Sequence, residues 1–179
     1  MESKNLIIRH AVFEDCRYFA QWEVMPEVTE FFTMDEGLTY EDVVTEFIKC
    51  KIDPSKEIFT ICLKETDEPI GKLFITNIND KCDSLDITRI YIAPKLNRGK
   101  GYGEEALRLF LEYAFINMHR ERVTLDYMTK NIIAQQLYQK IGFKREGTMR
   151  NSGKKNGKYL DLILMSMLRA DYYESIHDR

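Results

Sequence analysis

The sequence predicts a mixed α/β (α+β) fold that forms a single domain over residues 1–179. Short β-rich runs and runs with helical spacing of apolar residues follow one another in the order β-α-α-β-β-β-α-β-α-β-β. Tight turns join neighbouring strands in the first half and near the C-terminus, as in antiparallel hairpins. Hydrophobic residues make up 44% of the chain, which is enough for one ordinary core.

The first half of the chain is expected to combine short strands with two helices. In chain order these are a strand at 6–9, helices at 15–23 and 41–48, and strands at 58–63, 70–75 and 84–92. Pro26 is expected to close the first helix, and Thr39 to be the N-cap of the second. The turn at 66–69 then makes the strands on either side of it a hairpin.

The second half begins with the longest predicted helix. The segments expected there are a helix at 104–118, a strand at 123–127, a helix at 131–141 and a hairpin of strands at 143–149 and 158–168. Gly142 is expected to end the second of these helices, because glycine is common just after a helix C-terminus.

Composition limits the classes of function. The net charge of −3 argues against general binding of nucleic acid. No apolar run is long enough to span a membrane and no signal-peptide pattern is present, so we expect a cytoplasmic protein without a membrane partner. The four cysteines are far apart and form no CxxC pair: Cys16, Cys50, Cys62 and Cys82. They predict reduced thiols, and the three scattered histidines give no reason to expect a metal site.

A glycine-rich loop, Asn97–Gly103, links a predicted strand to the helix at 104–118. Glycines allow close backbone approach to a ligand, and the first turn of a helix has unpaired N–H groups, so the loop predicts an anion site, most naturally for phosphate. A dinucleotide motif would need glycine where Glu104 stands, and a Walker motif would need Ser or Thr where Gly101 stands. A turn that only caps the helix is the alternative.

Two segments together resemble a known family. Arg98-Gly99-Lys100-Gly101-Tyr102-Gly103, after a strand, resembles the R/Q-x-x-G-x-G/A loop of the GNAT N-acetyltransferase superfamily. Residues 131–143 resemble the N-x-x-A-x-x-x-Y-x-x-x-G-F helix of the same family. The C-terminal part is most similar to the branch that contains spermidine and ribosomal-protein alanine acetyltransferases. The resemblance is strong over residues 84–168 and only architectural before them.

The resemblance implies a mixed, mostly antiparallel sheet of about six to seven strands with about four helices, in which the fourth and fifth strands splay apart. It also implies that acetyl-CoA binds with its pyrophosphate on the glycine loop and its pantetheine arm along the fourth strand. The implied cofactor-binding residues are Ile90, Tyr91, Ile92, Arg98, Gly99, Lys100, Gly101, Tyr102, Gly103, Asn131 and Ala134. Because a carboxylate would repel the phosphates, we expect Glu104 to point to solvent.

Two residues are candidates for acid–base chemistry. Tyr138 occupies the family's general-acid position, from which a phenol can protonate the departing thiolate. Its alternative role is core packing, because it shares helical spacing with apolar neighbours. Asp86 stands where related enzymes often carry a Glu that acts as base. A strand-edge aspartate paired with a cation, with water as the base, is equally compatible with the sequence.

The acceptor side is less well defined. Between Tyr18 and Ile48 the chain has no Lys or Arg but eight acids: Glu23, Glu27, Glu30, Asp35, Glu36, Glu41, Asp42 and Glu46. The resemblance places this segment at the acceptor-side wall, where it would attract a cation; a solvated helix face is the alternative. Glu30 and Phe31 are the candidate substrate-binding residues.

We therefore expect an acetyl-CoA-dependent N-acetyltransferase that modifies a primary amine on a small cation such as a polyamine. Acetylation of a ribosomal-protein or other peptide N-terminus, and a non-catalytic acyl-CoA sensor, are the alternatives. A homodimer or larger assembly is a family expectation.

Overall fold

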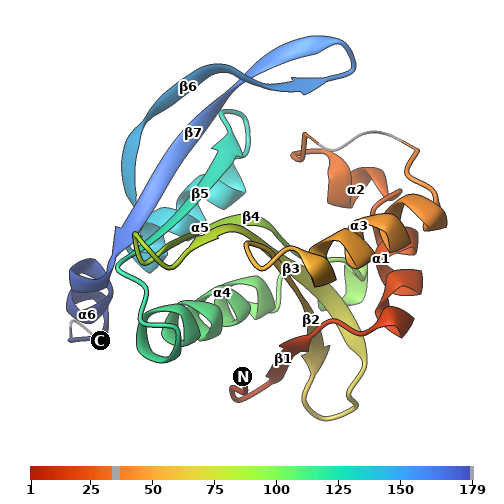
Figure 1. The fold of residues 1–179 in the computed structure, drawn as a ribbon, viewed down its shortest axis with the longest axis horizontal. Helices are drawn as coiled ribbons and strands as arrows, with labels where there is room; N and C mark the ends of the chain where they lie inside the picture. The colour runs from red at the N-terminus through yellow and green to blue at the C-terminus, as the bar shows by residue number, and fades with distance from the viewer. Residues whose placement is uncertain (34–36, 178–179) are drawn as a thin grey trace.

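The computed structural model describes residues 1–33 and 37–177 and contains one sheet in the order β1-β2-β3-β4-β5-β7-β6 (Figure 1). The strands are β1 (Leu6–His10), β2 (Glu57–Leu63), β3 (Pro69–Asn79), β4 (Ser84–Ile92), β5 (Arg122–Met128), β6 (Lys144–Lys155) and β7 (Lys158–Leu168). Neighbouring strands are antiparallel except for β4 and β5, which are parallel. The mixed, mostly antiparallel sheet confirms the predicted fold class.

The helices lie on both faces of this sheet. They are α1 (Cys16–Trp22), α2 (Pro26–Thr29), α3 (Tyr40–Ile52), α4 (Tyr102–Glu112), α5 (Ile132–Ile141) and α6 (Arg169–His177). A π-helical turn, Tyr113–Asn117, extends α4. Thr39 is the N-cap of α3, as expected, and accepts a hydrogen bond from the backbone N–H of Asp42 at 3.2 Å. None of the described helices is long and apolar enough to cross a membrane.

Two hydrophobic clusters hold the helices on the sheet. The larger joins α4 to the central strands, with Leu107 and Phe110 packed among residues such as Leu85 and Val123, all fully buried. The smaller joins α1 and α3 to the other face of β2, β3 and β4 through residues such as Phe19, Phe47 and Phe74. The clusters lie on opposite faces because successive strand residues point to opposite sides.

The structure differs from the sequence-based expectations at two helices. Pro26 does not simply close the first helix; it is the first residue of α2, a position that suits proline because its missing N–H is not needed there. Helix α6 was not expected. It follows β7 directly, so no turn residue marks the change from strand to helix, and only Tyr172 in it is buried. The apolar periodicity that predicted the other helices is therefore weak in α6.

Strands β4 and β5 are paired only along the first half of β4. Their pairing runs only from Ser84 with Arg122 to Ile87 with Leu125, although β4 continues to Ile92. A β-bulge lies at the same place: on β3, Phe74 pairs with Arg89 and Ile75 with Ile87, so Thr88 is an extra residue. The splay of these two strands confirms the arrangement that the resemblance implied.

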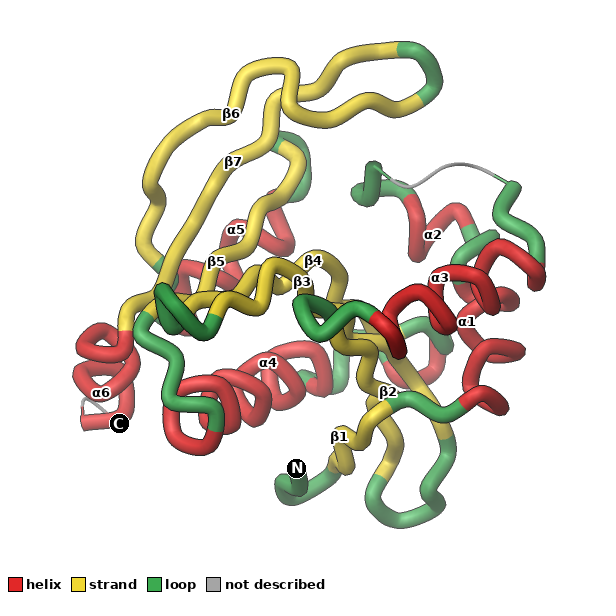
Figure 2. The backbone as a smooth tube through the Cα atoms, in the orientation of Figure 1, coloured by secondary structure: helices red, strands yellow, loops and turns green. Residues whose placement is uncertain are grey.

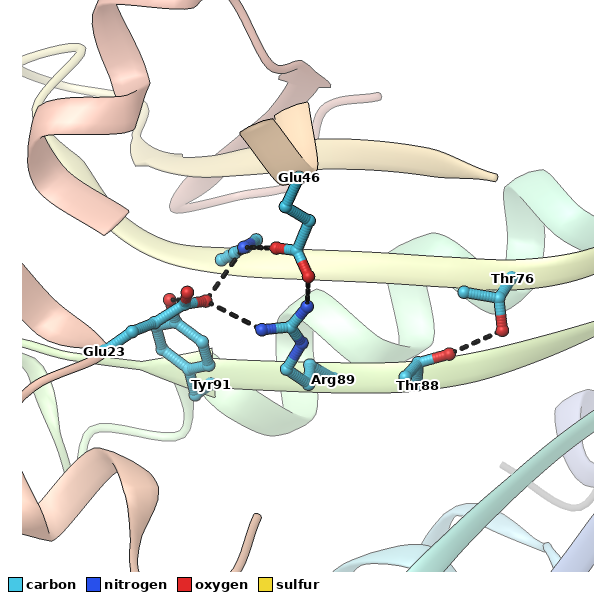
Figure 3. Close-up of polar contacts among 7 residues, drawn as sticks. Glu23, Glu46, Thr76, Thr88, Arg89 and Tyr91 are labelled. Carbon is cyan, nitrogen blue, oxygen red and sulfur yellow. Dashed lines mark hydrogen bonds and ion pairs between the residues drawn. The ribbon is translucent and has the colours of Figure 1, made fainter. Parts of the chain in front are cut away.

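A buried ionic network ties α1 and α3 to the sheet (Figure 3). Nζ of the fully buried Lys72 on β3 lies 2.8 Å from Glu23, just after α1, and 2.9 Å from Glu46 in α3. Arg89 on β4 pairs with the same two carboxylates, and the Tyr91 hydroxyl donates to Glu23 at 3.0 Å. Because buried charges are costly unless they are paired, these contacts fix both helices against β3 and β4.

Candidate functional site

A cavity of about 210 Å³ lies where β4 and β5 diverge. The candidate residues that line it come from four parts of the chain: Phe31, Ile90, Tyr91, Gly103, Asn131, Ala134 and Tyr138. The remaining candidates are not part of its lining: Glu30, Asp86, Ile92, Arg98, Gly99, Lys100, Gly101 and Tyr102. The fold thus brings the end of β4, the start of α4 and one side of α5 to a single cavity, as the two sequence motifs together predicted.

The glycine loop leaves open space before the first turn of α4. Gly99 and Gly101 have φ values of +72° and +83°, which side chains adopt only with strain. Gly103 has no such constraint, and a Cβ there would meet no other residue within 4 Å. The chain itself therefore gives no reason for glycine at 103. An open cradle beside the unpaired N–H groups of an 11-residue helix fits the pyrophosphate of a CoA molecule.

Two charged residues of this loop behave differently from the expectation. The guanidinium of Arg98 donates to the carbonyls of Ile92 at 3.0 Å and Ala93 at 2.5 Å, so it braces the end of β4 with two of its five N–H groups. Glu104 does not simply point to solvent: it pairs with Lys140 at 2.7 Å and Arg108 at 2.9 Å. Lys140, together with Arg108, holds the pKa of Glu104 below its usual value. One carboxylate beside two cations leaves this end of α4 suited to an anion.

Helix α5 presents Asn131 and Tyr138 to the cavity. Asn131 is the N-cap, since its side chain accepts from the N–H of Ala134 at 3.0 Å. Tyr138 packs its ring 5.9 Å from that of Tyr127 and 6.0 Å from that of Phe143. Burial, then the charge of Asp126, raises the pKa of Tyr138 well above its usual value. The hydroxyl therefore stays protonated at neutral pH, which a proton donor requires.

Asp86 is held by its neighbours. Asn77 donates to its carboxylate at 2.5 Å, and the hydroxyl of Thr124, directly opposite on β5, donates to the other oxygen. These contacts are close to the structural role considered for Asp86, that of a strand-edge aspartate held by a partner. The partners are an amide and a hydroxyl in place of a cation. Asp86 keeps its candidate role as base, but its carboxylate is already engaged.

Asp126 is a residue that the sequence did not single out. It is on β5, lines the cavity and is exposed to it. Partial removal of its carboxylate from water, and then the negative charge of Asp86, raise the pKa of Asp126. The segment 123–128 gave a signal, since a lone acid in an otherwise uncharged stretch of a central strand is unusual.

Contacts within the fold engage part of the acidic stretch of the N-terminal region, whereas Glu27, Glu30 and Glu41 are exposed to solvent. Glu23 and Glu46 are neutralised by Lys72 and Arg89, and Asp42 caps α3. Asp35 and Glu36 lie outside the described residues. The neutralising cations come from β3 and β4, outside the segment that was counted.

The two candidate substrate residues differ in their position relative to the cavity. Phe31 lines the cavity, together with Phe32 and Thr33, whereas Glu30 does not. The backbone carbonyl of Glu30 instead accepts from Lys155, at the tip of the β6–β7 hairpin, at 3.1 Å. No group of three or more His, Cys, Asp or Glu side chains within the described ranges is placed to hold a metal ion.

Comparison with known proteins agrees with this geometry. The model of the family described as "Acetyltransferase (GNAT) domain" matches residues 5–144. The chain is 24% identical over 173 residues to an uncharacterized N-acetyltransferase, p20, of Bacillus licheniformis, covering 95% of this chain and 96% of that one. It is 26% identical over 160 residues to the spermidine N(1)-acetyltransferase of Escherichia coli K12, covering 89% and 83%.

The fold is also that of a solved structure. The crystal structure of spermidine N-acetyltransferase from Vibrio cholerae in complex with CoA and spermine superposes with a TM-score of 0.87 at 22% identity, covering 96% of this chain and 99% of that one. The family match spans most of the sequence, and Gly103 of the loop motif and several residues of the α5 motif line the cavity. The chain therefore belongs to the GNAT acetyltransferase family and is an N-acetyltransferase that uses acetyl-CoA.

Proposed function

We propose that the acceptor is a small cationic molecule with more than one amine, such as a polyamine. The observation that carries this proposal is the character of the cavity beyond the cofactor cradle. Its lining contains aromatic and aliphatic groups and one carboxylate, Asp126, and includes no Lys, Arg or His among the described residues. Such a cavity favours an alkyl chain that carries positive charge.

The β6–β7 hairpin limits the size of the acceptor. Figure 2 shows this hairpin as a long extension that projects beyond the rest of the sheet. At that tip, Lys155 donates to the carbonyl of Thr29 at 2.5 Å, and a Cβ on Gly153 would come within 2.7 Å of Thr33. A hairpin that is held against the segment after α2 in this way suits a slender acceptor better than the N-terminus of a folded protein.

The relatives support the same acceptor class. Two of them are spermidine acetyltransferases, from Escherichia coli and Vibrio cholerae, and the second is 31% identical over 103 residues, or 58% of each chain. Because the identity of these relatives to this chain is low, the main support for the proposed acceptor class is the lining of its own cavity.

The candidate residues divide the work of acetyl transfer in this proposal. Acetyl-CoA supplies the activated acyl group. Backbone groups of the loop at 99–103 bind its pyrophosphate, and the unpaired edge of β4 at Ile90 and Tyr91 aligns the pantetheine arm. The hydroxyl of Tyr138 gives its proton to the departing thiolate. The acceptor loses its own proton to Asp86 through water, or to water alone, since Asn77 and Thr124 already donate to the Asp86 carboxylate.

An acetyl-CoA turnover screen tests the proposal. The purified protein is given polyamines, aminoglycosides, amino acids and peptides, and release of free CoA thiol is followed. We expect polyamines to have the highest kcat/KM. A peptide N-terminus that is acetylated faster than any polyamine would overturn the proposed acceptor and favour protein acetylation.

A further inference from the structure

Asp126 lies at the apex of the gap between the two splayed strands. The last β4–β5 pair joins Ile87 to Leu125, one residue before it. Its neighbours Leu125 and Tyr127 belong to the core that α4 covers, so Asp126 points to the opposite face of the sheet. Thr124, which shares that face, is bonded to Asp86. The carboxylate thus stands beside the reaction centre but on the side away from α4.

No residue of the described ranges neutralises Asp126. Among the described residues no Lys or Arg forms an ion pair with it, and no side chain or backbone N–H donates to its carboxylate. Other acids of the fold differ: the buried Asp15 pairs with Arg9 at 2.6 Å, and the exposed Glu146 pairs with Arg122 at 2.6 Å. Asp126, with no cation beside it, leaves negative charge at the cavity, and an incoming cation can pair with it.

Asp126 is also close to the proposed acid. Its negative charge contributes to the raised pKa of Tyr138, and the two side chains line the same cavity. Asp86 adds a second carboxylate on the neighbouring strand. A positive group bound to Asp126 would therefore share the cavity with the hydroxyl of Tyr138.

We propose that Asp126 binds a second ammonium group of the acceptor, next to the amine that is acetylated, and so selects diamines and polyamines over monoamines. This inference rests on the proposed function. The reacting amine must be uncharged to attack, whereas its neighbour can keep its charge and form the ion pair. Asp126 is thus a specificity-determining residue, and Tyr138 remains the proton donor.

The test uses two acceptors of equal chain length, butane-1,4-diamine and butylamine. Wild-type protein is expected to prefer the diamine, and Asp126→Asn to lose most of that preference, through a higher KM for the diamine and an unchanged KM for butylamine. A hydrogen bond between charged groups corresponds to roughly tenfold to hundredfold in kcat/KM. Asp126→Glu, which keeps the charge, is expected to restore part of the preference.

Two controls establish that the effect is local. The affinity for CoA, measured by calorimetry, is expected to be the same in wild type and Asp126→Asn, which also shows that the variant is folded. Glu65→Gln removes an exposed acid from the β2–β3 turn and is expected to leave the ratio between the two amines unchanged.

The outcomes separate the two proposals. If the wild type acetylates the diamine and Asp126→Asn keeps the same preference, the role of Asp126 is refuted while the proposed function stands. If the wild type acetylates a peptide but no diamine or polyamine, the proposed function fails and the role of Asp126 fails with it. Loss of the preference in Asp126→Asn alone, with unchanged CoA affinity, supports both.

Discussion

Two pairs of carboxylates on the same side of the sheet meet different environments. Glu23 and Glu46 are held by Lys72 and Arg89 in a buried network, and the strongest of these contacts are shorter than 3 Å. Asp126, which lines the cavity, has no cationic partner in the described part of the chain, and its neighbour Asp86 accepts only from neutral groups. The first pair fixes the structure, and the second keeps negative charge available at the cavity.

This contrast shows that the number of acids in a segment says little about the charge it presents. The N-terminal region looked like an acidic wall because its eight acids have no cation nearby in sequence. In space, cations from β3 and β4 reach two of them. The carboxylate that lines the cavity instead comes from β5, in a strand that is otherwise mostly buried.

The largest expected effect comes from removing a cation from the network that holds Glu23 and Glu46. Lys72→Met leaves Glu23 and Glu46 without their central cation, and loss of one partner from a buried ion pair costs about 3–5 kcal/mol. Urea unfolding is expected to show this as a lower free energy of unfolding. Lys64→Met is the matched control, because Lys64 forms an exposed pair with Glu2 and should change stability little. Equal losses in the two variants would contradict the structural role of the network.

The next effect concerns the proton donor beside the unpaired carboxylate. Tyr138→Phe is expected to lower kcat by roughly 10²–10⁴-fold while the affinity for CoA is kept, because only the proton is removed. Steady-state turnover and calorimetry measure the two quantities. Tyr173→Phe, at an exposed position on α6, serves as control. Unchanged turnover in Tyr138→Phe would remove it as the acid and leave it a packing residue.

A smaller effect is expected at the glycine loop. Gly103→Val fills the open cradle and is expected to weaken CoA binding by roughly tenfold, by analogy with the cost of overpacking. Valine is at least as favourable as glycine in a helix, so stability should not fall. Gly103→Ala, whose single methyl the motif allows, should bind CoA nearly as well as the wild type. Gly101 gives a poorer test, since its positive φ strains any side chain. Normal affinity in Gly103→Val would show that the cradle lies elsewhere.

The smallest effect distinguishes the two kinds of carboxylate by their pH dependence. Burial opposes ionisation of Glu46, but Lys72 and Arg89 outweigh it and hold its pKa below the usual value; Glu23 and Tyr91 complete its surroundings. The stability it contributes is therefore present above its unfolded-state pKa and is lost as the pH falls through the folded-state pKa. Glu46→Gln should destabilise the protein at pH 7 and much less in acid.

The stability that Asp126 contributes should change with pH in the direction opposite to that of Glu46. Burial and Asp86 raise its pKa, and the other titratable groups around it are Tyr127 and Tyr138. A raised carboxyl pKa favours the folded state at low pH, and that contribution is lost as the pH rises through the folded-state pKa. Asp126→Asn should therefore stabilise the protein at pH 7 relative to pH 4. Thermal unfolding of both variants between pH 4 and 8 measures the difference, and a common sign would contradict the comparison.

Much of the fold followed from the sequence because its signals are local. Thr39 caps the helix that it was expected to cap, and Gly142 ends α5 with a φ of +114°. The gap between α1 and α2, and helix α6, could not be predicted, because Pro26 both ends and begins a helix and α6 lacks a clear apolar stripe. Part of the candidate site was also predicted, since Gly103, Asn131 and Tyr138 belong to motifs with fixed spacing.

The sequence by itself determined the order of the strands, the glycine loop and the family, since each depends on neighbouring residues or on a fixed spacing. Only the tertiary structure decided which charges are free. Lys72 and Glu23 are 49 residues apart, and Asp86 and Thr124 are 38 apart, yet each pair is in hydrogen-bond contact. Whether an acid is neutralised depends on cations that other strands bring to it. That is why Asp126 emerged as a candidate for acceptor recognition only once the strands were in place.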